Sequence, residues 1–69
     1  MLNDTFKLSI NIDGAAFGDS DEERLDEVAR ILEETARRVR SGSIANHFTN
    51  LYDLNGNAVG QAAFKCEGY

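Results

Sequence analysis

The feature that most constrains the fold is one helix-forming segment, residues 20–42, which takes up about a third of the chain. Ser20 and Glu23 have the spacing of a capping box, in which the hydroxyl and the carboxylate each accept a hydrogen bond from an amide of the first turn. Gly42 provides a C-terminal stop. The segment therefore predicts one helix about 30 Å long, around which a chain of 69 residues must build its core.

One face of this helix is predicted to pack on the rest of the protein. Its apolar residues recur at steps of three and four and form a stripe: Leu25, Val28, Ala29, Leu32, Ala36 and Val39. Ile31 falls off the stripe by most of a right angle. We expect Ile31 either at the rim of the core or in contact with a partner, and we prefer the rim, because single exposed apolar residues are ordinary.

Strands are predicted on both sides of the helix. Residues 5–13 alternate between apolar and polar side chains, which is typical of a strand with one wet face. Phe17, in the loop that follows, is expected to close over the core just before the helix. Asn55 and Gly56 predict a hairpin between strands at residues 49–54 and 58–65, because both residues tolerate positive φ.

The register of this hairpin has two alternatives. A two-residue loop would place Leu54 opposite Asn57, whereas a three-residue loop closed by Asp53 and Asn57 would pair Leu51 with Val59. We prefer the second, because it joins two core candidates and lets Asp53 cap the turn.

The order β-α-β-β predicts a single α+β domain over residues 1–69, with one helix packed on a three-stranded, mostly antiparallel sheet. The first strand can pair antiparallel with the third, or parallel with the second through a right-handed crossover, and we prefer the first arrangement. One sheet face and both sheet edges would stay uncovered, so a homodimer through one of them is an expectation.

Charge and residue content narrow the classes of function. The net charge of −5 argues against direct binding of nucleic acid, because phosphate binding needs a basic face. Cys66 is the only cysteine and His47 the only histidine, and neither has a companion for metal binding or catalysis. We therefore expect no catalytic residue, no metal and no cofactor, hence no enzyme. No apolar run approaches the roughly 20 residues that span a bilayer, so we expect no membrane partner.

Residues 19–27 contain six carboxylates and one arginine, a local charge of −5 that equals the net charge of the whole chain. The carboxylates belong to Asp19, Asp21, Glu22, Glu23, Asp26 and Glu27. The helix dipole favours acids at this end, and i, i+4 pairs such as Asp26 with Arg30 explain part of the polar face. The density exceeds what capping requires, so two interpretations remain: a solvated helix start, or a patch that binds a basic partner.

The segments "NIDGAAFGDSDEERLDEVARILEETARRVRSG" and "LYDLNGNAVGQAAF" resemble small phage-encoded accessory proteins. These proteins share a short strand, an acidic loop that opens into one helix, and a terminal hairpin with a "D.NGN.VG" turn. The resemblance covers most of the chain except residues 41–49, and its motifs are structural. It implies a phage or prophage accessory gene that acts in the bacterial cytoplasm. Small acidic phage proteins include anti-CRISPR proteins, some of which resemble duplex DNA in charge.

Two hypotheses follow. The leading one is a counter-defence inhibitor, similar to anti-CRISPR proteins, that mimics DNA. Its six carboxylates would bind the basic, nucleic-acid-binding surface of a host complex such as a CRISPR effector. The alternative is a small dimeric phage accessory or assembly module with contacts through the exposed sheet face and Ile31. Tyr52 and Tyr69 are the aromatic residues best suited to exposure, because each has a polar tip.

Overall fold

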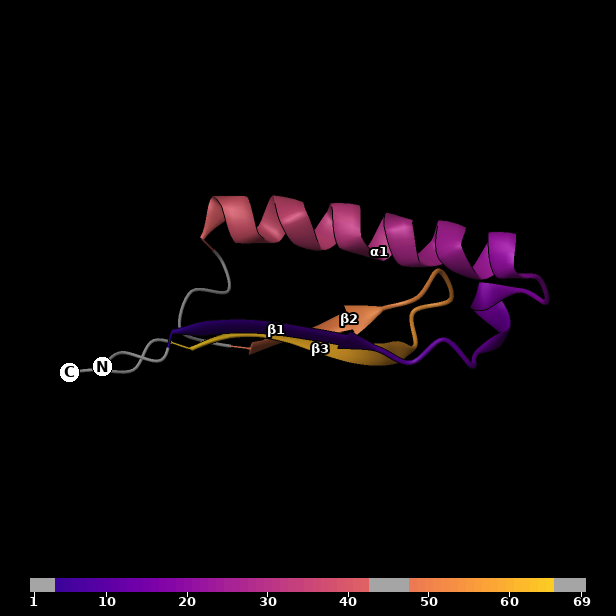
Figure 1. Ribbon diagram of the computed structural model, residues 1–69, viewed down its shortest axis with the longest axis horizontal. Helices are drawn as coiled ribbons and strands as arrows, with labels where there is room; N and C mark the ends of the chain where they lie inside the picture. The colour runs from indigo at the N-terminus through magenta and orange to yellow at the C-terminus, as the bar shows by residue number, and fades with distance from the viewer. Residues whose placement is uncertain (1–3, 43–47, 66–69) are drawn as a thin grey trace.

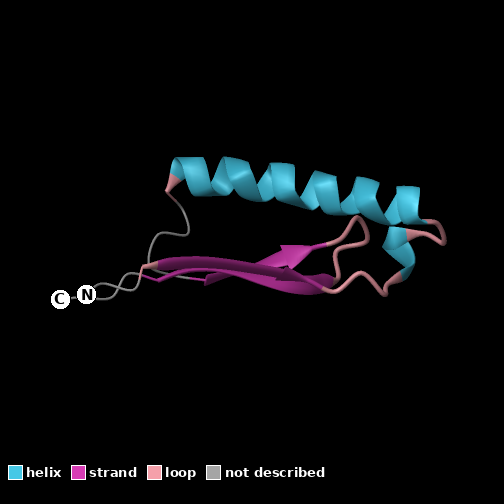
Figure 2. Ribbon diagram, in the orientation of Figure 1, coloured by secondary structure: helices cyan, strands magenta, loops and turns pink. Residues whose placement is uncertain are grey.

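The computed structural model describes residues 4–42 and 48–65, which form a helix layer on one face of a three-stranded antiparallel sheet (Figure 1). The elements are β1 (Thr5–Ile10), the 3-10 turn η1 (Ala15–Phe17), α1 (Asp21–Ser41), β2 (Phe48–Tyr52) and β3 (Ala58–Lys65). The helix runs back along the sheet in the direction opposite to β1. Among the described residues no element covers the other sheet face (Figure 2). The predicted α+β class is confirmed.

β3 is the central strand, because the sheet order is β1-β3-β2. It pairs antiparallel with β1, where Ile10 faces Gly60, and antiparallel with β2 on its other side. This confirms the preferred pairing of the first and third strands. β1 is shorter than expected and ends at Ile10. The side chain of Asn11 accepts a hydrogen bond from the amide of Asp13 at 2.9 Å, and this local turn leads the chain away from the sheet.

The hairpin closes at Asp53 and Asn57, as expected, but the pairing of β2 with β3 beyond Tyr52 is shifted by one residue from the predicted register. The amide of Asp53 donates to the carbonyl of Asn57 at 3.0 Å, so a three-residue loop joins the strands. Tyr52 faces Ala58, and a β-bulge then places Leu51 opposite Gly60. The predicted pairing of Leu51 with Val59 is therefore wrong. An additional residue of β3 occupies the bulge, a feature that strand alternation alone does not reveal.

Both predicted ends of the helix are confirmed. Ser20 and Glu23 form the complete capping box, with Ser20 Oγ accepting from the amide of Glu23 at 3.1 Å. Gly42 closes the other end in the left-handed conformation, at φ 81°, and its amide donates to the carbonyl of Val39. Glycine adopts this conformation at little cost, whereas other residues are strained there.

The buried face of α1 is not the predicted apolar stripe. Ile31 is only 2% exposed, and Glu27 and Thr35, one turn before and after it, are buried too. Leu25, Leu32 and Val39 are 67%, 43% and 45% exposed. Ala29 and Ala36 are also exposed, while Val28 is half-buried. The expectation that Ile31 lies at the rim or in an interface is therefore wrong. The pattern of apolar residues did not indicate this face, because Glu27 and Thr35, two of its three buried residues, are polar.

The hydrophobic core is small and consists of Phe17, Ile31, Leu51 and Ala62. Leu8, Ile10, Val28 and Val59 are partly buried against it. The exposure of Phe17 is 0%, which confirms that it closes over the core before the helix begins. Full burial of a side chain of this size contributes about 2 kcal/mol. A core this small leaves each member a large share of the stability.

We predict that Ile31→Ala lowers the free energy of unfolding by about 2–4 kcal/mol, because it opens a cavity in the core. Leu54→Ala is the control, since Leu54 is 67% exposed, and its cost should be below about 0.5 kcal/mol. Urea unfolding followed by circular dichroism measures both values. Equal losses of unfolding free energy in the two variants would contradict the orientation of α1 that buries Ile31.

Candidate interaction surfaces

Glu23 belongs to the N-terminus of α1. Its Oε1 accepts hydrogen bonds from the amides of Asp19, at 3.0 Å, and Ser20, at 3.3 Å. These bonds, the one from Asp19 above all, lower the pKa of Glu23 below its ordinary value of 4.5. The Glu23 carboxylate is therefore committed to the helix start.

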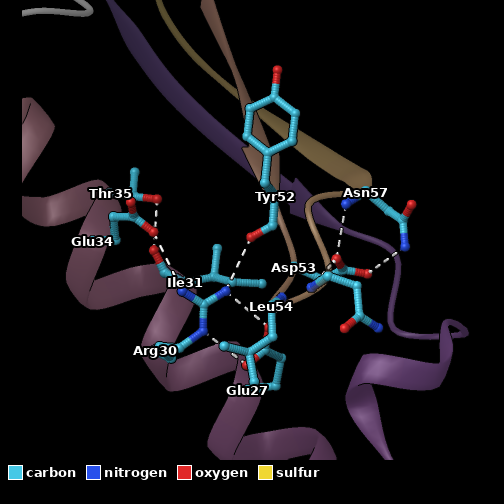
Figure 3. A network of polar contacts seen from close by, with 10 residues as sticks. Glu27, Arg30, Ile31, Glu34, Thr35, Tyr52, Asp53, Leu54 and Asn57 are labelled. Carbon is cyan, nitrogen blue, oxygen red and sulfur yellow. Dashed lines mark hydrogen bonds and ion pairs between the residues drawn. The ribbon is translucent and has the colours of Figure 1, made fainter.

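Glu27 is buried and joins the helix to the hairpin (Figure 3). Its two oxygens accept from Nε and Nη2 of Arg30, at 2.9 Å each, and Oε2 also accepts from the amide of Leu54 at 2.9 Å. Hydrogen bonding to Arg30 lowers the pKa of Glu27 despite desolvation, and the Leu54 amide adds to the effect. Arg30, expected to pair with Asp26, binds Glu27 and Glu34 instead.

Arginines of α1 cover the outer edge of β2. Nη2 of Arg30 donates to the carbonyl of Tyr52 at 3.1 Å. Nη1 of Arg38 donates to Thr49 Oγ1 at 2.7 Å and to the carbonyl of Asn50 at 3.3 Å. The helix therefore reaches over the sheet and binds the backbone of its edge strand.

The hairpin shows that the carbonyls of Asn50 and Tyr52 point outward from the sheet. The Asp53 amide points to β3, where it bonds to Asn57. Backbone groups alternate in direction along a strand, so the carbonyls of Tyr52 and Asn50 point away from β3. The expectation of two uncovered edges is thus met only in part at β2, because donors from α1 bind its outward carbonyls at Asn50 and Tyr52.

Asp53 organises the tip of the same hairpin. Its Oδ1 accepts from the amides of Asn55 and Asn57, at 2.9 Å each. Hydrogen bonding to the Asn57 amide is the main reason that the pKa of Asp53 lies below its ordinary value of 3.8. The expectation that Asp53 caps the turn is confirmed.

Five of the six predicted partner-binding carboxylates belong to exposed residues, and Glu27 is the buried one. Asp19, Asp21, Glu22 and Asp26 are exposed, while the exposed Glu23 also accepts the hydrogen bonds that cap the helix. Asp21 lies 3.6 Å from Arg24, but a solvated pair of this kind contributes little. The structure keeps an acidic helix start with fewer available groups than the sequence indicated.

A second surface is apolar and lies along the side of α1 that faces β1. Its row on the helix consists of Leu25, Leu32 and Val39, which are seven residues apart and exposed. A groove of about 420 Å³ separates Leu32 and Val39 of this row from β1. We call it the lateral groove; Leu32, Ala36 and Val39 line one side of it, and Phe6 and Leu8 line the other. Apolar surface of this kind, rimmed by polar residues, marks binding sites for proteins.

The open face of the sheet is mixed in character. Lys7, Ser9, Asn50 and Gln61 are exposed there, and Gln61 lies opposite both Ser9 and Asn50. Phe48 and Tyr52 lie two residues before and after Asn50 on β2, so they share this face and add exposed aromatic surface to it. The alternative hypothesis placed contacts on this face and on Ile31, but Ile31 is in the core. Tyr52 is 44% exposed, as expected.

Within residues 4–42 and 48–65, no group of three His, Cys, Asp or Glu side chains could hold a metal ion. In the same ranges no helix is long and apolar enough to cross a membrane. His47, Cys66 and Tyr69 lie outside the described residues. Comparison of the chain with protein-family models, curated proteins and solved structures found no match.

The sequence reasoning missed the contacts of Glu27, Arg30 and Arg38 with the second strand and its hairpin. A signal was present in the spacing of Glu27, Ile31 and Thr35, which share one side of the helix. Two polar members hid it from a search for apolar periodicity. A long arginine on such a face can reach backbone carbonyls of a neighbouring strand.

We predict that the protein loses stability in acid. Glu23 and Glu27 have pKa values lowered from 4.5, so their contribution is fully present above pH 4.5 and is lost as the pH falls through the folded-state values. Glu27→Gln should lower the free energy of unfolding at pH 7 by about 2 kcal/mol. It should also make the decline below pH 4.5 shallower than in the unmodified protein.

Glu33→Gln is the control, because Glu33 is exposed on α1 and should leave both quantities nearly unchanged. Urea unfolding at a series of pH values measures them. The same acid slope in Glu27→Gln and the unmodified protein would show that Glu27 is not the group whose protonation matters.

Proposed function

We propose that the protein is a non-catalytic interaction module, a small phage accessory protein that works by protein-protein contact through the lateral groove. The observation that carries this proposal is the exposure of Leu25, Leu32 and Val39, while polar residues of the same helix pack inward. Apolar side chains that stay outside the core and partly exposed are available for contact with another surface. The resemblance of the sequence to phage accessory proteins suggests the bacterial cytoplasm as the setting.

The test replaces the central residue of the row. Leu32→Glu should abolish the specific association of the protein with its own copies or with a host protein, because the contact would bury a carboxylate in apolar surroundings. Leu54→Glu is the control, since it introduces the same charge at an exposed leucine of the hairpin. Affinity capture with identification of the bound proteins measures the effect. An unchanged set of bound proteins for Leu32→Glu would refute the role of the groove.

A second candidate function is supported by the exposed acids Asp19, Asp21, Glu22 and Asp26. In this proposal the protein is a counter-defence inhibitor, similar to anti-CRISPR proteins. The acids would mimic DNA phosphates in a basic groove of a host complex such as a CRISPR effector. Glu23 and Glu27 would hold the helix start in place without contact to the partner.

The two proposals differ in their dependence on charge. Asp21→Asn combined with Glu22→Gln should reduce competition with DNA for a CRISPR effector about tenfold or more, and added salt should weaken it further. Glu33→Gln combined with Glu34→Gln is the control with the same change in charge at the middle of the helix. Displacement of labelled DNA measures competition. No competition by the unmodified protein, or equal competition by all variants, would count against DNA mimicry.

A further inference from the structure

We propose that the lateral groove binds a second copy of this chain. The two copies would join antiparallel along β1, about a two-fold axis close to Leu8 and Leu32, which both line the groove. The inference rests on the proposed interaction module and names its partner.

The first reason is that the two sheet edges differ. Two outward carbonyls of β2, those of Tyr52 and Asn50, already accept from Arg30 and Arg38, and just beyond β2 the amide of Leu54 donates to Glu27. No side chain of the described residues makes such contacts with β1 between Phe6 and Ile10. An unpaired edge of this kind is a template for another strand.

The backbone of β1 shows which groups are available. The amide of Asn11 donates to the carbonyl of Val59 at 2.7 Å, so Asn11 points its backbone groups toward β3. By alternation, Ile10, Leu8 and Phe6 point their amides and carbonyls away from β3. Those are the groups that would form a ladder with the partner's β1.

The second reason is the position of the groove. Phe6 and Leu8 lie on the free strand, and Leu32 and Val39 lie on the side of α1 above it. A partner must therefore supply an extended strand and, on the same side, apolar side chains. A second copy of this chain supplies both, because its own β1 lies beside its own apolar groove. Pairing of β1 with its copy would merge the two grooves into one apolar layer on a continuous six-stranded sheet, because each copy contributes three strands.

The third reason is the symmetry of α1. The two-fold axis that relates antiparallel edge strands is perpendicular to the sheet, so it keeps both helices on one face and makes them antiparallel. The row is centred on Leu32, with Leu25 and Val39 seven residues to either side. The axis thus brings Leu25 of each copy level with Val39 of the partner subunit.

Charge favours the same arrangement. The exposed acid Glu22 lies at the start of α1, and the exposed Arg40, which lines the lateral groove, lies near its end. In antiparallel copies the acidic start of one helix lies beside the basic end of the other, whereas parallel copies would place like charges together. The surface is complementary to itself, as a two-fold interface requires.

Sedimentation equilibrium of the full chain tests the inference. The unmodified protein should be a concentration-dependent dimer, and Phe6→Glu and Leu32→Glu should each raise its dissociation constant about 100-fold or more. Phe48→Glu is the control, since Phe48 is 63% exposed on the opposite edge strand, and it should leave the constant unchanged. Circular dichroism checks that each variant is folded.

Amide hydrogen exchange locates the interface. The amides of Phe6, Leu8 and Ile10 should be protected at concentrations where the dimer forms and should lose protection on dilution. The amides of Lys7 and Ser9, which pair with β3, should be protected at both concentrations.

A protein that stays monomeric at all concentrations would overturn the inference, and so would a dimer that Phe6→Glu leaves intact. If the protein is monomeric but Leu32→Glu still loses a host protein, the inference fails and the interaction module stands. If no association of either kind depends on Leu32, the proposed function fails as well.

Discussion

The hydrogen-bonded pair of Glu27 and Arg30 is the contact on which the arrangement of the molecule depends. The Glu27 carboxylate holds Arg30 and the amide of Leu54, and Arg30 reaches the carbonyl of Tyr52. A helix rotated about its axis would carry Glu27 and Arg30 together, but it would separate Glu27 from the amide of Leu54 and Arg30 from the carbonyl of Tyr52. Hydrogen bonds to charged groups of this kind contribute about 1.5–3 kcal/mol each. The polar pair therefore fixes the rotation of α1, which a core of four apolar residues would fix only weakly.

The same contact explains why the two sides of the molecule differ. Anchoring over β2 brings Arg38 to the carbonyl of Asn50, so that this carbonyl is already bonded. It also turns Leu32 and Val39 toward β1, where the lateral groove stays open. A helix centred on its apolar stripe would have filled this groove with its own side chains. The exposed row is thus a consequence of polar anchoring.

Features that depend on neighbouring residues could be predicted from the sequence. The capping box of Ser20 and Glu23, the left-handed Gly42 and the loop closed by Asp53 and Asn57 all follow from local backbone chemistry. The burial of Phe17 also followed from its place before the helix.

Features that depend on contacts between distant segments could not be predicted in the same way. The face of the helix was wrong because Glu27 becomes favourable in the interior only beside Arg30 and the Leu54 amide, and that amide belongs to a distant hairpin. The β-bulge beside Leu51 was missed because strand alternation assumes regular pairing. For the acidic segment, composition showed how many carboxylates are present. Only the fold showed that Glu27 is buried and that Glu23, although exposed, is hydrogen-bonded at the helix start, unlike Asp19, Asp21, Glu22 and Asp26.

On α1 the residues that attach the helix differ from the exposed apolar row, and this affects how the sequence can evolve. In most amphipathic helices the apolar residues hold the fold, so a substitution that alters binding on that side endangers folding. Here Glu27, Ile31 and Thr35 attach the helix, while Leu25, Leu32 and Val39 stand apart from the core. The outer row can therefore acquire new side chains, and with them new specificity, on an unchanged scaffold. Descendants of such a chain could diverge in their partners while keeping one architecture, and a designer could use the same freedom.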